Sequence, residues 1–105
     1  MWAAWETSQD GATWRHYGTI EVDRDYTMFS LLLIDIGPNR AGYPDNADTR
    51  TLKALYLGCT TSQAWASLDD LRALVERQDV DIPQLREIVD SAPRAPFVRL
   101  LYCMD

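Results

Sequence analysis

The sequence predicts an α+β fold, in which an N-terminal β-hairpin and a small antiparallel sheet pack on a buried helix. Three observations lead to this prediction. An Asp-Gly pair separates two aromatic-rich segments near the N-terminus, a dense apolar run covers residues 26–36, and apolar residues recur at helical spacing in 68–78 and 82–92. A chain of 105 residues is expected to form one domain, spanning 1–105.

The Asp-Gly pair at positions 10–11 predicts the turn of the hairpin, because a type I′ turn requires positive φ at both central residues. If these two residues form the whole loop, Glu6 lies opposite Arg15 and Trp5 lies opposite His16. Side chains alternate between the two faces of a strand, so the register also predicts each face. The face expected against the helix holds Trp5, Trp14, His16, Ile20 and Val22. The face expected in solvent holds Trp2, Glu6, Arg15, Tyr17, Glu21 and Asp23.

Residues 26–36 form the densest apolar run, and we interpret them as a buried helix that the rest of the chain covers. Asp25 is suited to accept hydrogen bonds from the free amides of the first turn. Gly37 followed by Pro38 ends the helix, because glycine tolerates the left-handed conformation there and proline cannot continue the winding. The run is too short to span a bilayer.

Residues 37–51 are rich in Gly, Pro, Asn and Asp and are expected to form a long loop. A loop of this length in a small domain is either functional or a simple connection, and both interpretations stay open. Tyr43, between Gly42 and Pro44, is a candidate exposed anchor for a partner, because aromatic residues are favoured at interfaces. Residues 52–59 are interpreted as a strand, with a short helix as the alternative.

A helix is predicted over 68–78. Ser67 is its N-cap, and Asp70 occupies the reciprocal capping-box position. Asp69 and Asp70 also place negative charge at the positive end of the helix dipole. Since adjacent residues on a helix point in different directions, these two carboxylates are not expected to form an acid-base dyad.

A second helix is predicted over 82–92, where Pro83 falls within the first turn and its missing amide costs little. The chain then closes with a strand at about 97–104 that is rich in apolar and aromatic residues. We expect this strand to lie inside the sheet.

The charge of the chain is lopsided, with 16 acidic residues, 10 basic residues and a formal net charge of −6. This balance argues against direct binding to nucleic acid, because such proteins gain affinity by neutralising phosphates with Lys and Arg. Residues 66–90 hold three arginines and most of the excess of acidic residues. This charge predicts either a surface that steers the protein toward a basic partner or a face that is only solvated. Its acidic residues are Asp69, Asp70, Glu76, Asp79, Asp81, Glu87 and Asp90.

No catalytic motif, phosphate-binding loop or metal-binding spacing occurs in the sequence, so no cofactor and no metal are expected. The two cysteines, Cys59 and Cys103, are interpreted as reduced, buried thiols. The N-terminus lacks the features of a signal peptide, and together these points predict a cytoplasmic protein. His16, the single histidine, is interpreted as part of an aromatic cluster.

Two motifs resemble small uncharacterised proteins of tailed bacteriophages. They are Arg-Asp-Tyr-Thr-Met-Phe at 24–29 and Trp-Ala-Ser-Leu-Asp-Asp-Leu at 65–71. The chain departs from the pattern at Met28, where Leu is commoner, and at 60–62, where a stretch containing His is usual. The resemblance implies a phage protein acting in the host cell, and small acidic phage proteins include anti-CRISPR proteins and other inhibitors of host defence.

The leading hypothesis is therefore a cytoplasmic binding or inhibitor protein, not an enzyme, that uses the acidic surface and Tyr43 on a host protein. That partner would be a nucleic-acid-binding defence complex, with no direct contact to nucleic acid or membrane. Two alternatives stay open. One is a small enzyme or ligand-binding domain that uses Cys59 and His16, and the other is an oligomeric structural protein with Trp2 and Tyr17 at the contact.

Overall fold

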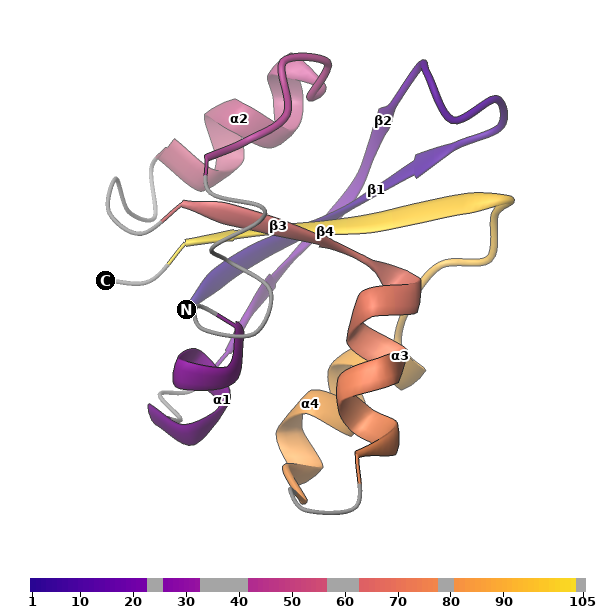
Figure 1. Ribbon diagram of the computed structural model, residues 1–105. Helices are drawn as coiled ribbons and strands as arrows, with labels where there is room; N and C mark the ends of the chain where they lie inside the picture. The colour runs from indigo at the N-terminus through magenta and orange to yellow at the C-terminus, as the bar shows by residue number, and fades with distance from the viewer. Residues whose placement is uncertain (23–25, 33–41, 57–62, 78–80, 104–105) are drawn as a thin grey trace.

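The computed structural model describes residues 1–22, 26–32, 42–56, 63–77 and 81–103, and it confirms the predicted α+β fold (Figure 1). The described residues form one antiparallel sheet with helices on both of its faces. The elements in chain order are β1 (Trp2–Ser8), β2 (Arg15–Glu21), α1 (Tyr26–Leu31), α2 (Thr49–Tyr56), β3 (Ala64–Ser67), α3 (Leu68–Glu76), α4 (Pro83–Asp90) and β4 (Phe97–Cys103).

The sheet has the strand order β2-β1-β4-β3, so the first and the last strand of the chain lie together at its centre. They pair along their whole length, from Trp2 opposite Cys103 to Ser8 opposite Phe97. Every residue of β4 after Phe97 is buried, since this strand has neighbours on both edges and helices on both faces. The prediction that the last strand lies inside the sheet is confirmed.

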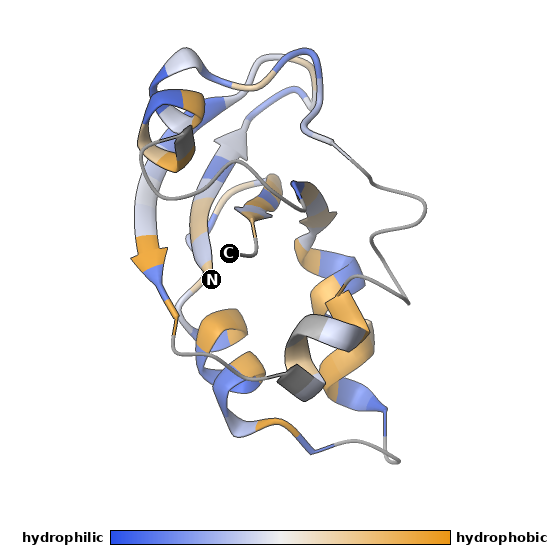
Figure 2. Cartoon of the chain, turned by 90° about the vertical axis from the view of Figure 1, so that its left-hand side faces the viewer, coloured by the Kyte–Doolittle hydropathy of each residue, from blue (hydrophilic) through white to orange (hydrophobic). Residues whose placement is uncertain are grey.

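Two apolar cores lie on opposite faces of the sheet. The larger core packs Ala3 and Trp5 of β1 against α1, α3 and α4. The smaller core packs Ala4 of β1 and Leu101 of β4 against Leu55 of α2. Figure 1 shows α2 on one side of the sheet and the other three helices on the opposite side, and Figure 2 shows hydrophobic and hydrophilic residues next to each other along the helices.

The two helices after β3 confirm the predictions made from capping and periodicity. Ser67 and Asp70 form the capping box of α3, with each side chain accepting from the other residue's backbone amide. Leu71 of α3 is fully buried, and Leu85 of α4 packs into the same core. Pro83 occupies the first turn of α4, as expected.

The apolar run at 26–36 begins as the predicted helix, and 33–36 lies outside the described residues, as do Asp25, Gly37 and Pro38. Met28 and Leu32 are buried in the larger core, whereas Thr27 and Ser30 are exposed. The run therefore covers one face of the sheet with one side of a short helix. The apolar run was expected to form the centre of the fold. The pair of strands β1 and β4 forms that centre instead.

The hairpin turns at 10–11 as predicted, but the predicted register of its two strands is wrong. Thr7 lies opposite Arg15 and Trp5 lies opposite Gly18, with a bulge between Trp5 and Glu6. The connection spans residues 9–14 because Asp10 organises a wider turn than the two-residue type. Its Oδ1 accepts from the amides of Ala12 and Thr13, both at 2.8 Å, and Gly11 has the expected positive φ of 78°.

Two polar side chains of the hairpin have surroundings that differ from the prediction. Glu6 lies opposite His16, so both occupy the face that α2 covers. Glu6 is fully buried there rather than in solvent, and His16 is not on the face of Trp5. The one-residue shift of register puts His16 on the opposite face from Trp5. Glu6 keeps its predicted face, but α2 and not solvent covers that face.

The strand predicted at 52–59 is wrong over 52–56, because Thr49–Tyr56 is helix α2, the alternative considered above, and 57–59 lies outside the described residues. Asp48 begins this helix: its Oδ1 accepts from the amide of Arg50 at 2.9 Å, and its carbonyl accepts from the amide of Leu52. Thr51 and Leu55, four residues apart, point toward the sheet and are buried. The end of the predicted loop at 49–51 thus belongs to the helix. The sequence analysis also missed the short strand β3.

Cys103 corrects the prediction of two reduced thiols, because it is buried and disulfide-bonded. Cys59, the other cysteine of the chain, lies outside the described residues. Disulfides persist mainly in oxidising compartments, so the cysteines no longer support a cytoplasmic location. Among the described residues, no helix is long and apolar enough to cross a membrane.

Candidate functional site

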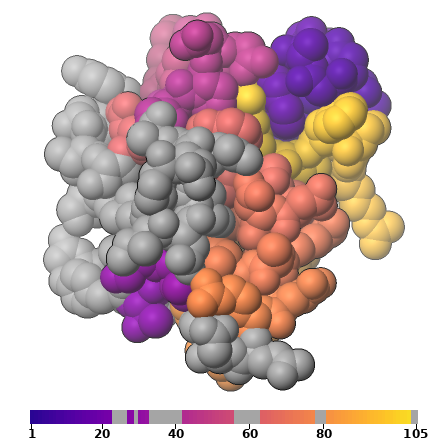
Figure 3. Space-filling view, viewed as in Figure 1, coloured from indigo at the N-terminus to yellow at the C-terminus, as the bar shows by residue number. Residues whose placement is uncertain are grey.

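The described residues of the predicted acidic surface lie on α3, on α4 and at Asp81 before α4, and α3 and α4 border each other on the molecular surface in Figure 3. Asp70 is only half-exposed, because it belongs to the capping box. Asp81 is exposed but forms an ion pair with Arg86. Asp79 lies outside the described residues. Four exposed carboxylates have no hydrogen bond or ion pair with any described residue, namely Asp69, Glu76, Glu87 and Asp90.

Tyr43 is not the exposed anchor that the sequence analysis predicted. Its side chain is half-buried against the smaller core, and its hydroxyl donates to the carbonyl of Tyr102 at 3.3 Å. Burial raises the pKa of Tyr43 to about 12. The hydroxyl is therefore committed to holding the segment before α2 on β4.

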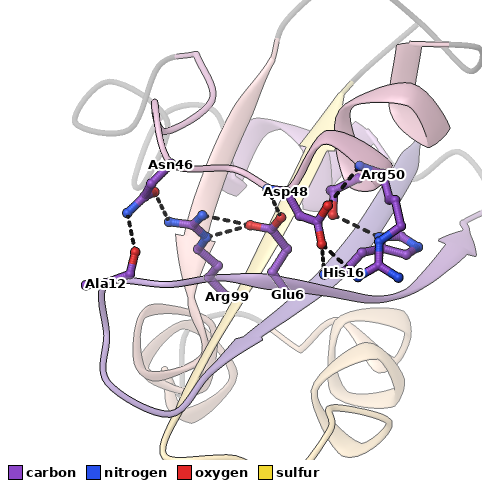
Figure 4. A network of polar contacts seen from close by, with 8 residues as sticks. Glu6, Ala12, His16, Asn46, Asp48, Arg50 and Arg99 are labelled. Atoms are coloured by element: carbon purple, nitrogen blue, oxygen red, sulfur yellow. Dashed lines mark hydrogen bonds and ion pairs between the residues drawn. The ribbon is translucent and has the colours of Figure 1, made fainter.

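A buried ion pair between Glu6 and Arg99 occupies the centre of the α2 face (Figure 4). Arg99 Nε donates to Glu6 Oε1 at 2.8 Å, and Nη2 lies 2.7 Å from the same oxygen. The other oxygen, Oε2, accepts from the backbone amide of Asp48 at 2.8 Å. Arg99 Nη1 donates to Asn46, which in turn donates to the carbonyl of Ala12 in the hairpin loop. The network ties the hairpin, β4 and the start of α2 together.

Asp48 extends this network to the edge strand. Its Oδ2 accepts from the backbone amide of His16 at 2.8 Å and from the Arg50 guanidinium at 3.1 Å. The hydrogen bond from the His16 amide, followed by those from Arg50, holds the pKa of the Asp48 carboxyl well below its usual range. The ring of His16 does not meet this carboxylate, because its Nδ1 lies 2.8 Å from Thr51 Oγ1.

The described residues contain no catalytic arrangement around His16. Thr51 is fully buried, so its hydroxyl is out of reach of a substrate. Cys59 lies outside the described residues, and within the described ranges no group of His, Cys, Asp or Glu is suited to hold a metal ion. His16 was expected among aromatic residues, and its observed contacts are polar ones that fasten β2 to α2.

An aromatic cleft of about 300 Å³ lies beside the ion pair, between the hairpin, the start of β4 and the start of α3. Its walls include Trp14, Trp65 and Phe97, and Asp69 and Arg72 of α3 also line it. We call it the aromatic cleft. The sequence analysis missed it, because its walls come from three distant parts of the chain; the only signal was the number of aromatic residues.

Arg99 connects the aromatic cleft with the polar network. The carbon of its guanidinium lies 3.9 Å from the ring centroid of Trp14 and 5.8 Å from that of Trp65. Burial lowers the pKa of Arg99, and the hydrogen bond and charge of Glu6 act in the opposite direction. Glu6 and the two rings thus hold a cation in a site that excludes water.

Comparisons with protein-family models, with curated proteins and with solved structures found no match for this chain. The resemblance to tailed-phage proteins therefore stays a prediction, and the function has to be argued from the residues themselves.

Proposed function

We propose that this protein binds a basic surface of another protein through the carboxylates of α3 and α4. The observation that carries the proposal is that Asp69, Glu76, Glu87 and Asp90 are exposed and have no partner among the described residues. Carboxylates that serve folding are paired or cap a helix, as Glu6, Asp48 and Asp70 do here. Unpaired carboxylates on neighbouring helices are available to a cationic partner and raise its association rate.

In the finer form of this proposal, the protein is a phage inhibitor of a host defence complex, for which an anti-CRISPR protein is the model. The acidic surface would occupy the groove in which that complex binds nucleic acid. The net charge of −6 and the motif resemblance support this form. The identity of the partner is inferred from the resemblance alone. The carboxylates indicate only that the partner is positively charged.

The test reverses three of the unpaired carboxylates together, as Asp69→Lys, Glu76→Lys and Glu87→Lys. The tagged protein is used to capture its partner from a bacterial lysate without reductant, since Cys103 is disulfide-bonded. Nucleic acid is then added as a competitor. We expect the unaltered protein to retain a nucleic-acid-binding complex and to release it to the competitor.

The control reverses two exposed acids elsewhere, Glu21→Lys and Asp45→Lys, which leaves α3 and α4 intact. Loss of capture by the first variant with retention by the control supports the proposal. Equal capture by both variants and the unaltered protein would contradict it. Circular dichroism of each variant separates a lost contact from a lost fold.

A second candidate, self-association, is kept because Tyr17 is 63% exposed beside the bulge of the edge strand β2. Trp2, the other predicted contact, is half-buried in the smaller core. Sedimentation at high concentration separates the two functions: a dimer that Tyr17→Ser dissociates would support self-association, and a monomer would count against it.

A further inference from the structure

We propose that the aromatic cleft receives an arginine or lysine side chain of the partner protein. This inference rests on the proposed function and specifies where the acidic surface takes a single cationic residue. Figure 3 shows the hairpin, β4 and α3 bordering one another on the same side of the molecule as α4, so one partner can contact both.

The chain itself shows that these rings attract a cation. The guanidinium of Arg99 stacks on Trp14 at 3.9 Å, because the face of an indole ring is electrically negative. Both tryptophans of the cleft are half-buried rather than covered. Phe97 is 46% exposed and offers apolar area for the methylene groups of a long basic side chain.

Among the charged residues that line the cleft, Asp69 is the one that favours a cation. Asp69 is exposed, lines the cleft and has no partner among the residues that the structure describes. The positive charge of Arg99 is offset by Glu6 at 2.7 Å, so it does not cancel that of Asp69. Arg72 lies on the same rim and opposes an incoming cation. The two rim residues therefore predict opposite effects on binding.

The size of the cleft is sufficient for a single long side chain. Small-molecule sites have volumes of about 300–1,000 Å³, and this cleft lies at the lower end with about 300 Å³. An arginine or lysine side chain is long and narrow, with an apolar stem and a charged end. Its stem would pack on Phe97 and its charged end would reach Asp69.

The experiment titrates the protein with the peptide acetyl-Gly-Ser-Arg-Ser-Gly-amide and follows the indole N–H signals of the four tryptophans by NMR. The same peptide with Gln in place of Arg is the uncharged probe. We expect the signals of Trp14 and Trp65 to shift with the Arg peptide only. Trp5 is buried in the larger core, and its signal should stay in place.

Variants at the rim test the charge argument. Asp69→Asn should weaken binding of the Arg peptide roughly two- to fivefold, and Arg72→Gln should strengthen it by a similar factor, as exposed charge pairs do. Glu87→Gln is the matched control, since it removes the same charge from α4, and it should change the affinity less than Asp69→Asn.

Two outcomes would overturn the proposal: no shift of Trp14 and Trp65, or equal effects of Asp69→Asn and Glu87→Gln. Equal effects would mean that the acidic surface attracts cations without a specific site in the aromatic cleft. The proposed function would then stand, and the inference about the cleft would fail. If instead the charge-reversed protein still captured its partner, the proposed function would fail whatever the peptide does.

Discussion

The two faces of the sheet are held by different forces. One face buries an apolar core against α1, α3 and α4, and its members are apolar residues spaced at the period of a helix or a strand. The other face has a small apolar core under α2 and a polar network centred on Glu6 and Arg99. The stability of the first face depends on the apolar area removed from water, whereas that of the second depends on a few specific polar contacts.

The contrast explains which parts of the molecule carry surface features. The apolar face is closed by helices whose outer sides are solvated, and those sides present the unpaired carboxylates. On the polar face, α2 covers only part of the sheet, and the remaining part exposes the aromatic cleft beside Arg99. Four substitutions test this contrast, taken from the largest expected effect to the smallest.

Breaking the ion pair from one side should have the largest effect. Glu6→Leu leaves the guanidinium of Arg99 buried without its carboxylate, so we expect a loss of about 3–5 kcal/mol in the free energy of unfolding. Urea unfolding followed by circular dichroism measures it. The double variant Glu6→Leu with Arg99→Met removes both charges and should regain most of the loss. A single variant as stable as the unaltered protein would show that the polar face does not depend on this pair.

The corresponding change on the apolar face is Leu71→Ala. Leu71 is fully buried in the larger core, and truncation leaves a cavity, so unfolding should become easier by about 3 kcal/mol. The matched control is Leu52→Ala on the exposed side of α2, which should cost less than about 1 kcal/mol. Equal losses for both leucines, in the same urea experiment, would argue against the assignment of the core.

Asp48→Asn tests the polar face through the pH dependence of the free energy of unfolding. At neutral pH we expect a loss of roughly 1 kcal/mol, because the amide cannot accept equally well from His16 and lacks the charge that faces Arg50. The pKa of Asp48 is lowered in the folded state, so the unfolded state binds more protons near pH 4. The stabilisation is present above about pH 4 and is lost as the pH falls toward the folded pKa.

The difference between Asp48→Asn and the unaltered protein should therefore shrink when urea unfolding is repeated at pH 3. A difference that stays constant from pH 7 to pH 3 would mean that the charge of Asp48 contributes nothing. The comparison between variants is needed because hydrogen bonds from Thr13, Ala12 and Ser8 also lower the pKa of Asp10 to about 2.

Gly11→Ala should cost about 1 kcal/mol, no more than Asp48→Asn does. The position has φ 78°, and a Cβ there would lie 3.4 Å from the ring of Phe97. The control is Gly18→Ala, where a Cβ meets nothing within 4 Å and no positive φ is required. Thermal unfolding should place Gly18→Ala at or slightly above the unaltered protein. A fall of equal size in both variants would mean that turn geometry is not the cause.

Particular residues show how far sequence reasoning reaches. Ser67 and Asp70 predicted the start of α3, and Pro83 predicted the first turn of α4, because a capping residue acts on amides within its own turn. The register of the hairpin was missed because Asp10 satisfies three polar groups of a wider loop. The helix α2 was given only as the alternative to a strand, because Asp48, its cap, was included in a predicted loop.

The candidate site also has residues that the sequence predicted and residues that it did not. The carboxylates of α3 and α4 were named from charge alone, and four of them are exposed and unpaired among the described residues. Tyr43 was named from its neighbours and is held by Tyr102, a residue 59 positions away in the chain. The aromatic cleft had no local signal at all.

The sequence by itself determined the class of the fold, the position of the hairpin turn, the helices α3 and α4 and the acidic character of their outer sides. Each of these depends on spacing or on contacts within one turn, where the chain leaves few alternatives. Only the tertiary structure decided the partner of Glu6, the place of His16, the disulfide of Cys103 and the walls of the aromatic cleft. They depend on contacts between distant parts of the chain, such as the pairing of β4 with β1, which brings together Arg99 and Glu6 from 93 positions apart.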